Sequence, residues 1–154
     1  KGRGSWPAIW MLPTAWNVGS GNWPDVGEID IMEHVGHDPG RVHASIHCKK
    51  YQWPLGTQKT AVIDVSDAGE EFHVYILEWS PERLQAWVDG RHYFTFENEE
   101  AGWESWPYGR PFHLILNIAV GGMWGGAKGI DDDALPFRME VDYVRVYQER
   151  GHNN

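Results

Sequence analysis

Apolar and polar positions alternate along much of this chain, which is the pattern of half-buried β-strands. Seven stretches show it, separated by clusters of Gly, Pro, Asn and Asp: residues 26–35, 41–48, 72–79, 84–88, 92–96, 112–120 and 139–147. The dipeptide Asp89-Gly90, between two of these stretches, is typical of a tight β-hairpin. No segment combines a sustained helical period with caps at both ends. The pattern therefore predicts an all-β sandwich of antiparallel strands.

The chain has 154 residues, enough for one hydrophobic core, and no repeat, linker or shift in composition divides it. We therefore expect one domain over residues 1–154. Residues 1–13 place tryptophans beside prolines and show no leading strand, as if the chain began in mid-fold. This opening predicts that N-terminal strands of the sheet are lacking here and belong to a longer precursor.

The charge balance disfavours two classes of partner. Thirteen Lys and Arg residues stand against 22 Asp and Glu residues, a net charge of -9. Such a surface repels phosphate backbones and anionic lipid, so we expect no nucleic acid and no membrane partner. No apolar run approaches the roughly 18 residues of a membrane-spanning helix. The single cysteine, Cys48, cannot form an internal disulfide, so cysteine usage does not indicate a compartment.

Ten tryptophans are more than one core of this size requires. An indole offers a flat apolar face and one N–H donor, which suits a flat ligand with polar edges. Trp6 and Trp10 each fit either a ligand platform or a core position. For Trp23 the role of a ligand platform is favoured, because this residue lies just ahead of the most acidic strand.

That strand, residues 27–33 (GEIDIME), holds three carboxylates. On a regular strand Glu28 and Asp30 share one face, whereas Glu33 would point into the apolar layer. A carboxylate buried there without a cation is costly. We therefore infer a one-residue bulge near Ile31-Met32 that returns Glu33 to the Glu28 face.

With this bulge, Glu28 and Glu33 are separated by about four strand steps, roughly 13 Å between Cα atoms. Two leaning side chains close most of this distance, and retaining glycosidases hold their two carboxyl groups roughly 5–5.5 Å apart. Asp30, between them, would raise the proton affinity of a neighbour or orient it by a hydrogen bond. Two other interpretations stay open: a solvated, half-exposed strand, and a calcium or other hard-metal site built from the same carboxylates.

Six segments in this order resemble glycoside hydrolase family 16: residues 6–13 (WPAIWMLP), 27–33, 42–47 (VHASIH), 72–79 (FHVYILEW), 117–122 (NIAVGG) and 141–147 (VDYVRVY). The acid motif with its inserted Met is similar to the laminarinase, or endo-β-1,3-glucanase, branch. The resemblance covers nearly the whole chain. It implies a jelly-roll sandwich of two curved antiparallel sheets, with a glucan groove on the concave face.

The resemblance also implies an activity, the retaining endo-hydrolysis of β-1,3-glucan. It makes Glu28 the nucleophile, Asp30 its assistant and Glu33 the acid/base, in a reaction that requires no cofactor. It further implies an extracellular or periplasmic protein. Many family members carry an outer calcium site, for which the position of Asp142 would supply one ligand together with N-terminal partners.

Two alternatives to this function remain. The chain could be a lectin-like module that binds glucan without cleaving it. It could also be a family-16 enzyme that acts on agar, carrageenan or mixed-linkage glucan. Family domains are considerably longer than this chain, so its open sheet edges leave room for self-association.

Further residues are candidates for substrate binding. His43 and His47 share one strand face, but no third spaced ligand supports a metal pair. The resemblance instead places His47 in the groove near Glu33. Asn117 and Trp124 flank Gly pairs in a segment that either caps one end of the groove or forms a plain hairpin turn.

Overall fold

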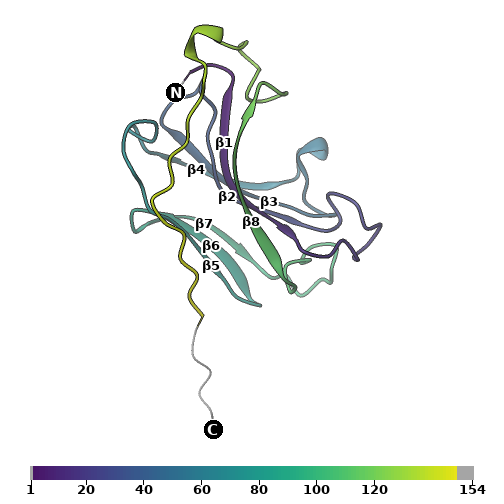
Figure 1. Ribbon diagram of the computed structural model, residues 1–154. Helices are drawn as coiled ribbons and strands as arrows, with labels where there is room; N and C mark the ends of the chain where they lie inside the picture. Colours follow the sequence, from purple (N-terminus) through teal and green to yellow (C-terminus); the bar gives the residue numbers. More distant parts are fainter. Residues whose placement is uncertain (1, 149–154) are drawn as a thin grey trace.

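The computed structural model describes residues 2–148 and shows two antiparallel β-sheets (Figure 1). The first sheet has the strand order β4-β3-β2-β1-β8, from β1 (Ser5–Pro13), β2 (Glu28–Glu33), β3 (Arg41–His47), β4 (Lys59–Asp64) and β8 (Phe112–Val120). The second has the order β5-β6-β7, from β5 (Tyr75–Trp79), β6 (Arg83–Val88) and β7 (Arg91–Glu97). Two short 3₁₀ helices, η1 (Trp53–Leu55) and η2 (Asp132–Ala134), lie in loops. The predicted antiparallel sandwich is confirmed.

Within residues 2–148, no helix combines the length and the apolar character needed to cross a membrane.

The core lies between the two sheets. Ile29 on β2 and Ile46 on β3 are almost completely buried, and they pack in one cluster with Leu84 on β6 and Phe94 and Phe96 on β7. Because strand side chains alternate, burying these residues turns their neighbours on β2 and β3 toward the other face of the first sheet. The core therefore decides which face carries the polar side chains.

A buried tyrosine supports the strand that follows the acids. Tyr108 has no exposed surface, and its hydroxyl donates a hydrogen bond to the backbone carbonyl of His47, at 2.9 Å. Its ring packs against Trp106 and Phe112, at centroid distances of 5.2 and 5.9 Å. This contact fixes the end of β3 that carries His47.

Three strand predictions differ from the structure. Residues 5–13 form β1, a central strand between β2 and β8, although Pro7 and the tryptophans suggested an irregular segment. The outer strand β4 has a weak apolar pattern and was not predicted. Residues 139–147 were predicted as a strand, but they form an extended segment that pairs with no strand among the described residues. Each difference depends on whether a partner strand is present, which local periodicity does not report.

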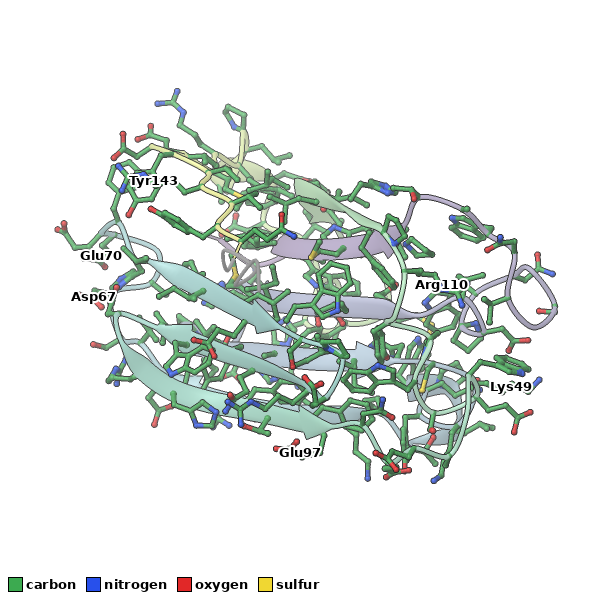
Figure 2. The ribbon with its side chains drawn as sticks, turned by 90° about the horizontal axis from the view of Figure 1, so that it is seen from below. Lys49, Asp67, Glu70, Glu97, Arg110 and Tyr143 are labelled. Carbon is green, nitrogen blue, oxygen red and sulfur yellow. The ribbon has the colours of Figure 1, made fainter. Side chains whose placement is uncertain are left out.

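The core side of β1 and β8 is only partly covered. A cavity of about 1720 Å³ opens between these strands, β5 and the C-terminal segment. Figure 2 shows the C-terminal segment with Tyr143 on one side of this opening and β5 on the other. Its lining includes the exposed apolar side chains of Ile76, Leu116 and Val141. Among residues 2–148, strands β5 and β8 each pair with a single neighbour, which leaves their outer edges open as the sequence suggested.

We expect Tyr108→Phe to lower the free energy of unfolding by about 1–2 kcal/mol, because the His47 carbonyl loses its buried donor while the ring packing is kept. Chemical denaturation measures this change. Tyr147→Phe is the matched control, since Tyr147 is 81% exposed, and its stability should equal that of the wild type. Equal stability of Tyr108→Phe and the wild type would show that this hydrogen bond contributes nothing.

Candidate active site

A β-bulge brings the three acids of β2 to one face of the sheet. On β3, Asp30 lies opposite Ser45 and Glu33 opposite His43, so three steps on β2 match two steps on β3. The pairing with β1 shows the same shift, with the extra residue at Ile31. The predicted bulge near Ile31-Met32 is therefore confirmed.

Burial explains why the bulge forms at this point. Ile31 and Met32 are adjacent in sequence, yet both are buried in the core, at 7% and 6% exposure. Two successive side chains on one face require an irregular step in the strand. The Tyr93 hydroxyl donates a hydrogen bond to the Ile31 carbonyl and so satisfies one backbone group at the irregular step.

Three tryptophans hold the polar residues of this face through their indole N–H groups. Trp23 Nε1 donates to Glu28 Oε2 at 2.9 Å, and Trp6 Nε1 donates to Glu33 Oε1 at 2.9 Å. Trp10 Nε1 donates to Asn117 Oδ1 at 2.8 Å. The structure thus gives Trp6, Trp10 and Trp23 a hydrogen-bonding role that sequence reasoning missed, because their partners lie on other strands or across a turn.

His47 lies beside the first two acids. It faces Glu28 across the β2–β3 pair, and its Nε2 is 3.9 Å from Glu28 Oε1 and 3.3 Å from Asp30 Oδ2. Its ring is 5.7 Å from the ring of Trp23. His47 also interacts electrostatically with Glu33, and His43 is the cross-strand neighbour of Glu33.

Trp124 packs around the other end of the acid row. Its ring makes edge contacts with Trp6 at 5.5 Å and with His43 at 4.8 Å. The loop that carries it approaches Trp6 closely, since a Cβ at Gly125 would lie 2.9 Å from the Trp6 Cβ and 2.6 Å from the Gly121 carbonyl oxygen. Only glycine fits at Gly125, so this loop is held against the tryptophan that contacts Glu33.

Burial shapes the proton affinity of all three acids. Burial, followed by the charge of Asp30, raises the pKa of Glu28 from 4.5 to about 9. Burial and the charge of Glu33 raise the pKa of Asp30 well above its usual range. Burial also raises the pKa of Glu33, against the opposing effects of the Trp6 hydrogen bond and of His47. The three groups therefore do not all carry a charge at neutral pH.

The contacts indicate where the charge resides. Asp30 is the most buried acid, at 3% side-chain exposure, so it is the best placed to keep a proton. With Asp30 neutral, its charge no longer raises the pKa of Glu28, and the Trp23 N–H stabilises the Glu28 carboxylate. When Glu28 loses its proton, it becomes an anion beside Glu33, whose raised pKa favours the protonated form. Such a pair of carboxyls with different protonation states can act as nucleophile and acid.

The calcium contact at Asp142 stays a prediction. Asp142 is exposed on the unpaired C-terminal segment. Among residues 2–148, one group of at least three His, Cys, Asp or Glu side chains lies close enough together to share a metal ion. It consists of Glu28, Asp30 and His47, and Asp142 is not part of it.

The family model described as glycosyl hydrolases family 16 matches residues 1–145. The chain belongs to this family. The solved laminarinase from Rhodothermus marinus superposes on this family-16 chain with a TM-score of 0.86 and 53% identity, over 88% of this chain and 56% of that structure. The jelly-roll expectation is confirmed by this match.

Two curated relatives of this family-16 chain are named for different activities. The beta-glucanase of Rhodothermus marinus is 55% identical over 153 residues, which are 96% of this chain and 54% of the relative. The keratan-sulfate endo-1,4-beta-galactosidase of Sphingobacterium multivorum is 41% identical over 152 residues, which are 96% of this chain and 34% of the relative. The chain thus spans about half or less of the length of these relatives.

We expect Glu28→Gln to stabilise the protein increasingly as pH rises. The folded-state pKa of Glu28 is raised from 4.5 to about 9, so the folded state binds more protons than the unfolded state between these values. Wild-type stability therefore falls through this window, whereas the uncharged amide avoids that loss. The advantage should be small near pH 4.5 and about 4–5 kcal/mol near pH 8.

Chemical denaturation at several pH values measures this difference. Glu78→Gln is the control, because Glu78 is exposed on β5 and belongs to the other sheet. A constant difference between Glu28→Gln and wild type across the window would refute the raised pKa of Glu28.

Proposed function

We propose that this family-16 chain carries the catalytic residues of a retaining endo-hydrolase of β-1,3-glucan. The observation that carries the proposal is the bulged strand β2, which holds Glu28 and Glu33 on one sheet face with an indole N–H on each carboxyl group. The beta-glucanase and laminarinase relatives support β-1,3-glucan as substrate.

In this proposal the two glutamates divide the work. Glu33, protonated at the start, donates its proton to the leaving glycosidic oxygen while Glu28 attacks the anomeric carbon and forms a glycosyl-enzyme. Glu33, now ionised, removes a proton from a water molecule that attacks the anomeric carbon and releases the sugar from Glu28. Asp30, neutral and buried, orients Glu28.

The surrounding residues suit the binding of a sugar. Trp6, Trp10 and Trp23 are half-buried, so each presents part of an indole face while its N–H holds a polar residue. We assign substrate contacts to these three tryptophans and to His47, Asn117 and Trp124. The proposal involves no resident cofactor.

A polymer of glucose cannot cross a membrane intact, and this supports an extracellular or periplasmic enzyme.

The galactosidase relative favours one alternative, a different polysaccharide as substrate. A product profile on laminarin, mixed-linkage glucan, agar, carrageenan and keratan sulfate separates these substrates. The lectin-like alternative predicts glucan binding without release of reducing sugar.

Glu28→Gln and Glu33→Gln should each lower the turnover of laminarin by about 10⁴-fold or more, because each removes one of the two groups that the double displacement requires. Reducing-sugar release measures turnover, and calorimetry with a laminari-oligosaccharide measures binding, which should persist. The control Glu78→Gln should retain full turnover. Hydrolysis near the wild-type rate in either active-site variant would exclude these roles.

Trp6→Phe should move the alkaline limb of the kcat/KM profile to higher pH by about one unit. The indole N–H stabilises ionised Glu33, so its loss raises the pKa of the acid, which then stays protonated to higher pH. Trp16→Phe, at a 46% exposed tryptophan, is the matched control and should leave the profile unchanged. An alkaline limb that stays in place or moves to lower pH contradicts the assignment of Trp6 to Glu33.

A further inference from the structure

Three side chains from two strands bring together the donor atoms of a metal site. Glu28 and Asp30 on β2 and His47 on β3 each offer one donor atom, and these atoms all lie within 4.8 Å of one another. His47 Nε2 is 3.3 Å from Asp30 Oδ2 and 3.9 Å from Glu28 Oε1. Sequence spacing could not find this set, because the histidine comes from the neighbouring strand.

Two buried atoms at this position lack hydrogen-bond partners. Within residues 2–148, Asp30 Oδ2 and His47 Nδ1 are buried and make no hydrogen bond. Asp30 is 3% exposed and His47 is 7% exposed. Asp30 Oδ2 lies near His47 Nε2 but is not aligned with it as a hydrogen bond. An unsatisfied buried oxygen aimed at an imidazole nitrogen is a favourable place for a cation.

The donor types select the ion. A tetrahedral Zn²⁺ with bonds of about 2.0–2.2 Å to nitrogen and oxygen places its ligand atoms about 3.3–3.5 Å apart, close to the observed separations. Ca²⁺ requires six to eight oxygen ligands at longer distances, which this set does not supply. Zn²⁺ binds the ionised form of a carboxyl group, so its binding releases the proton that Asp30 holds in the metal-free protein.

We propose that Glu28 Oε1, Asp30 Oδ2 and His47 Nε2 bind one Zn²⁺ ion, which excludes glucan from the catalytic carboxylates. The ion is an inhibitor and not a cofactor, because it occupies the oxygen that would attack the sugar. Trp23 remains on the other oxygen, Oε2, so the Glu28 side chain keeps its position when the ion binds. The binding stands on the geometry alone, whereas the inhibition rests on the proposed function.

Metal binding is tested without reference to activity. The chelator-treated protein is titrated with Zn²⁺ in a calorimeter, and with Co²⁺ as a coloured probe of coordination by visible absorption. The wild type should bind one ion of each at this site. Loss of a residue that only supports a metal ligand weakens metal binding by about 10–100-fold. His47→Asn removes a ligand itself, so it should raise the Zn²⁺ Kd by more than that.

The matched control is His73→Asn. His73 also lies between two carboxylates, with Nε2 3.4 Å from Asp67 and Nδ1 2.7 Å from Asp89, so it reports adventitious binding of Zn²⁺ to another histidine beside carboxylates. This control should bind Zn²⁺ at the three-residue site as the wild type does. Glu28→Gln provides a second disruptive variant that keeps an acceptor for Trp23, in case His47→Asn fails to fold. An unchanged Zn²⁺ Kd in a folded His47→Asn or Glu28→Gln protein overturns the proposal.

Competition connects the ion to the substrate. A laminari-oligosaccharide should weaken Zn²⁺ binding, and Zn²⁺ should inhibit hydrolysis in proportion to occupancy, with full recovery after addition of chelator. If the metal-free protein hydrolyses no polysaccharide but still binds one Zn²⁺ through His47, the proposed function fails and the metal site stands. If it hydrolyses laminarin and Zn²⁺ binds elsewhere, the metal site fails and the proposed function stands.

Discussion

The chemistry of this protein depends on the burial of two neighbouring side chains. Ile31 and Met32 both enter the core, although a regular strand would send one of them outward. The strand meets this demand with an extra residue, and the consequence is that Glu33 faces the same side as Glu28. Apolar packing on one face thus places charge on the other.

That placement has an electrostatic cost, and the molecule offsets it locally. Three carboxyl groups share a buried region, where they disfavour one another's charge. Indole N–H groups stabilise the ionised forms of Glu28 and Glu33, since each donates a hydrogen bond without adding a charge. A lysine or arginine there would favour full ionisation of its acid and suppress the proton donor. Neutral donors allow Glu28 and Glu33 to differ in protonation state. The proposed mechanism requires this difference, because one group acts as nucleophile and the other as acid.

Local patterns predicted most of this arrangement. The bulge followed from the cost of a buried carboxylate at Glu33, and the β6–β7 hairpin followed from Asp89-Gly90, where Asp89 adopts a positive φ of 48°. The identity of the indole acceptors and the proximity of His47 to Asp30 did not follow, because both depend on strand register and side-chain direction across the sheet. For the same reason β1 was missed: Pro7 disfavours a strand locally, yet pairing on both sides stabilises it.

Strand β1 has two sides with separate environments. Its outward indoles, Trp6 and Trp10, hold Glu33 and Asn117, while its inward side chains Ile9 and Met11 line the cavity beneath. One backbone thickness therefore separates the reactive acids from an apolar space that side chains of other sizes could fill. For an engineer, repacking Ile9, which pairs with Met32 next to Glu33, is a route to shift this acid from the core side without replacing any outward side chain.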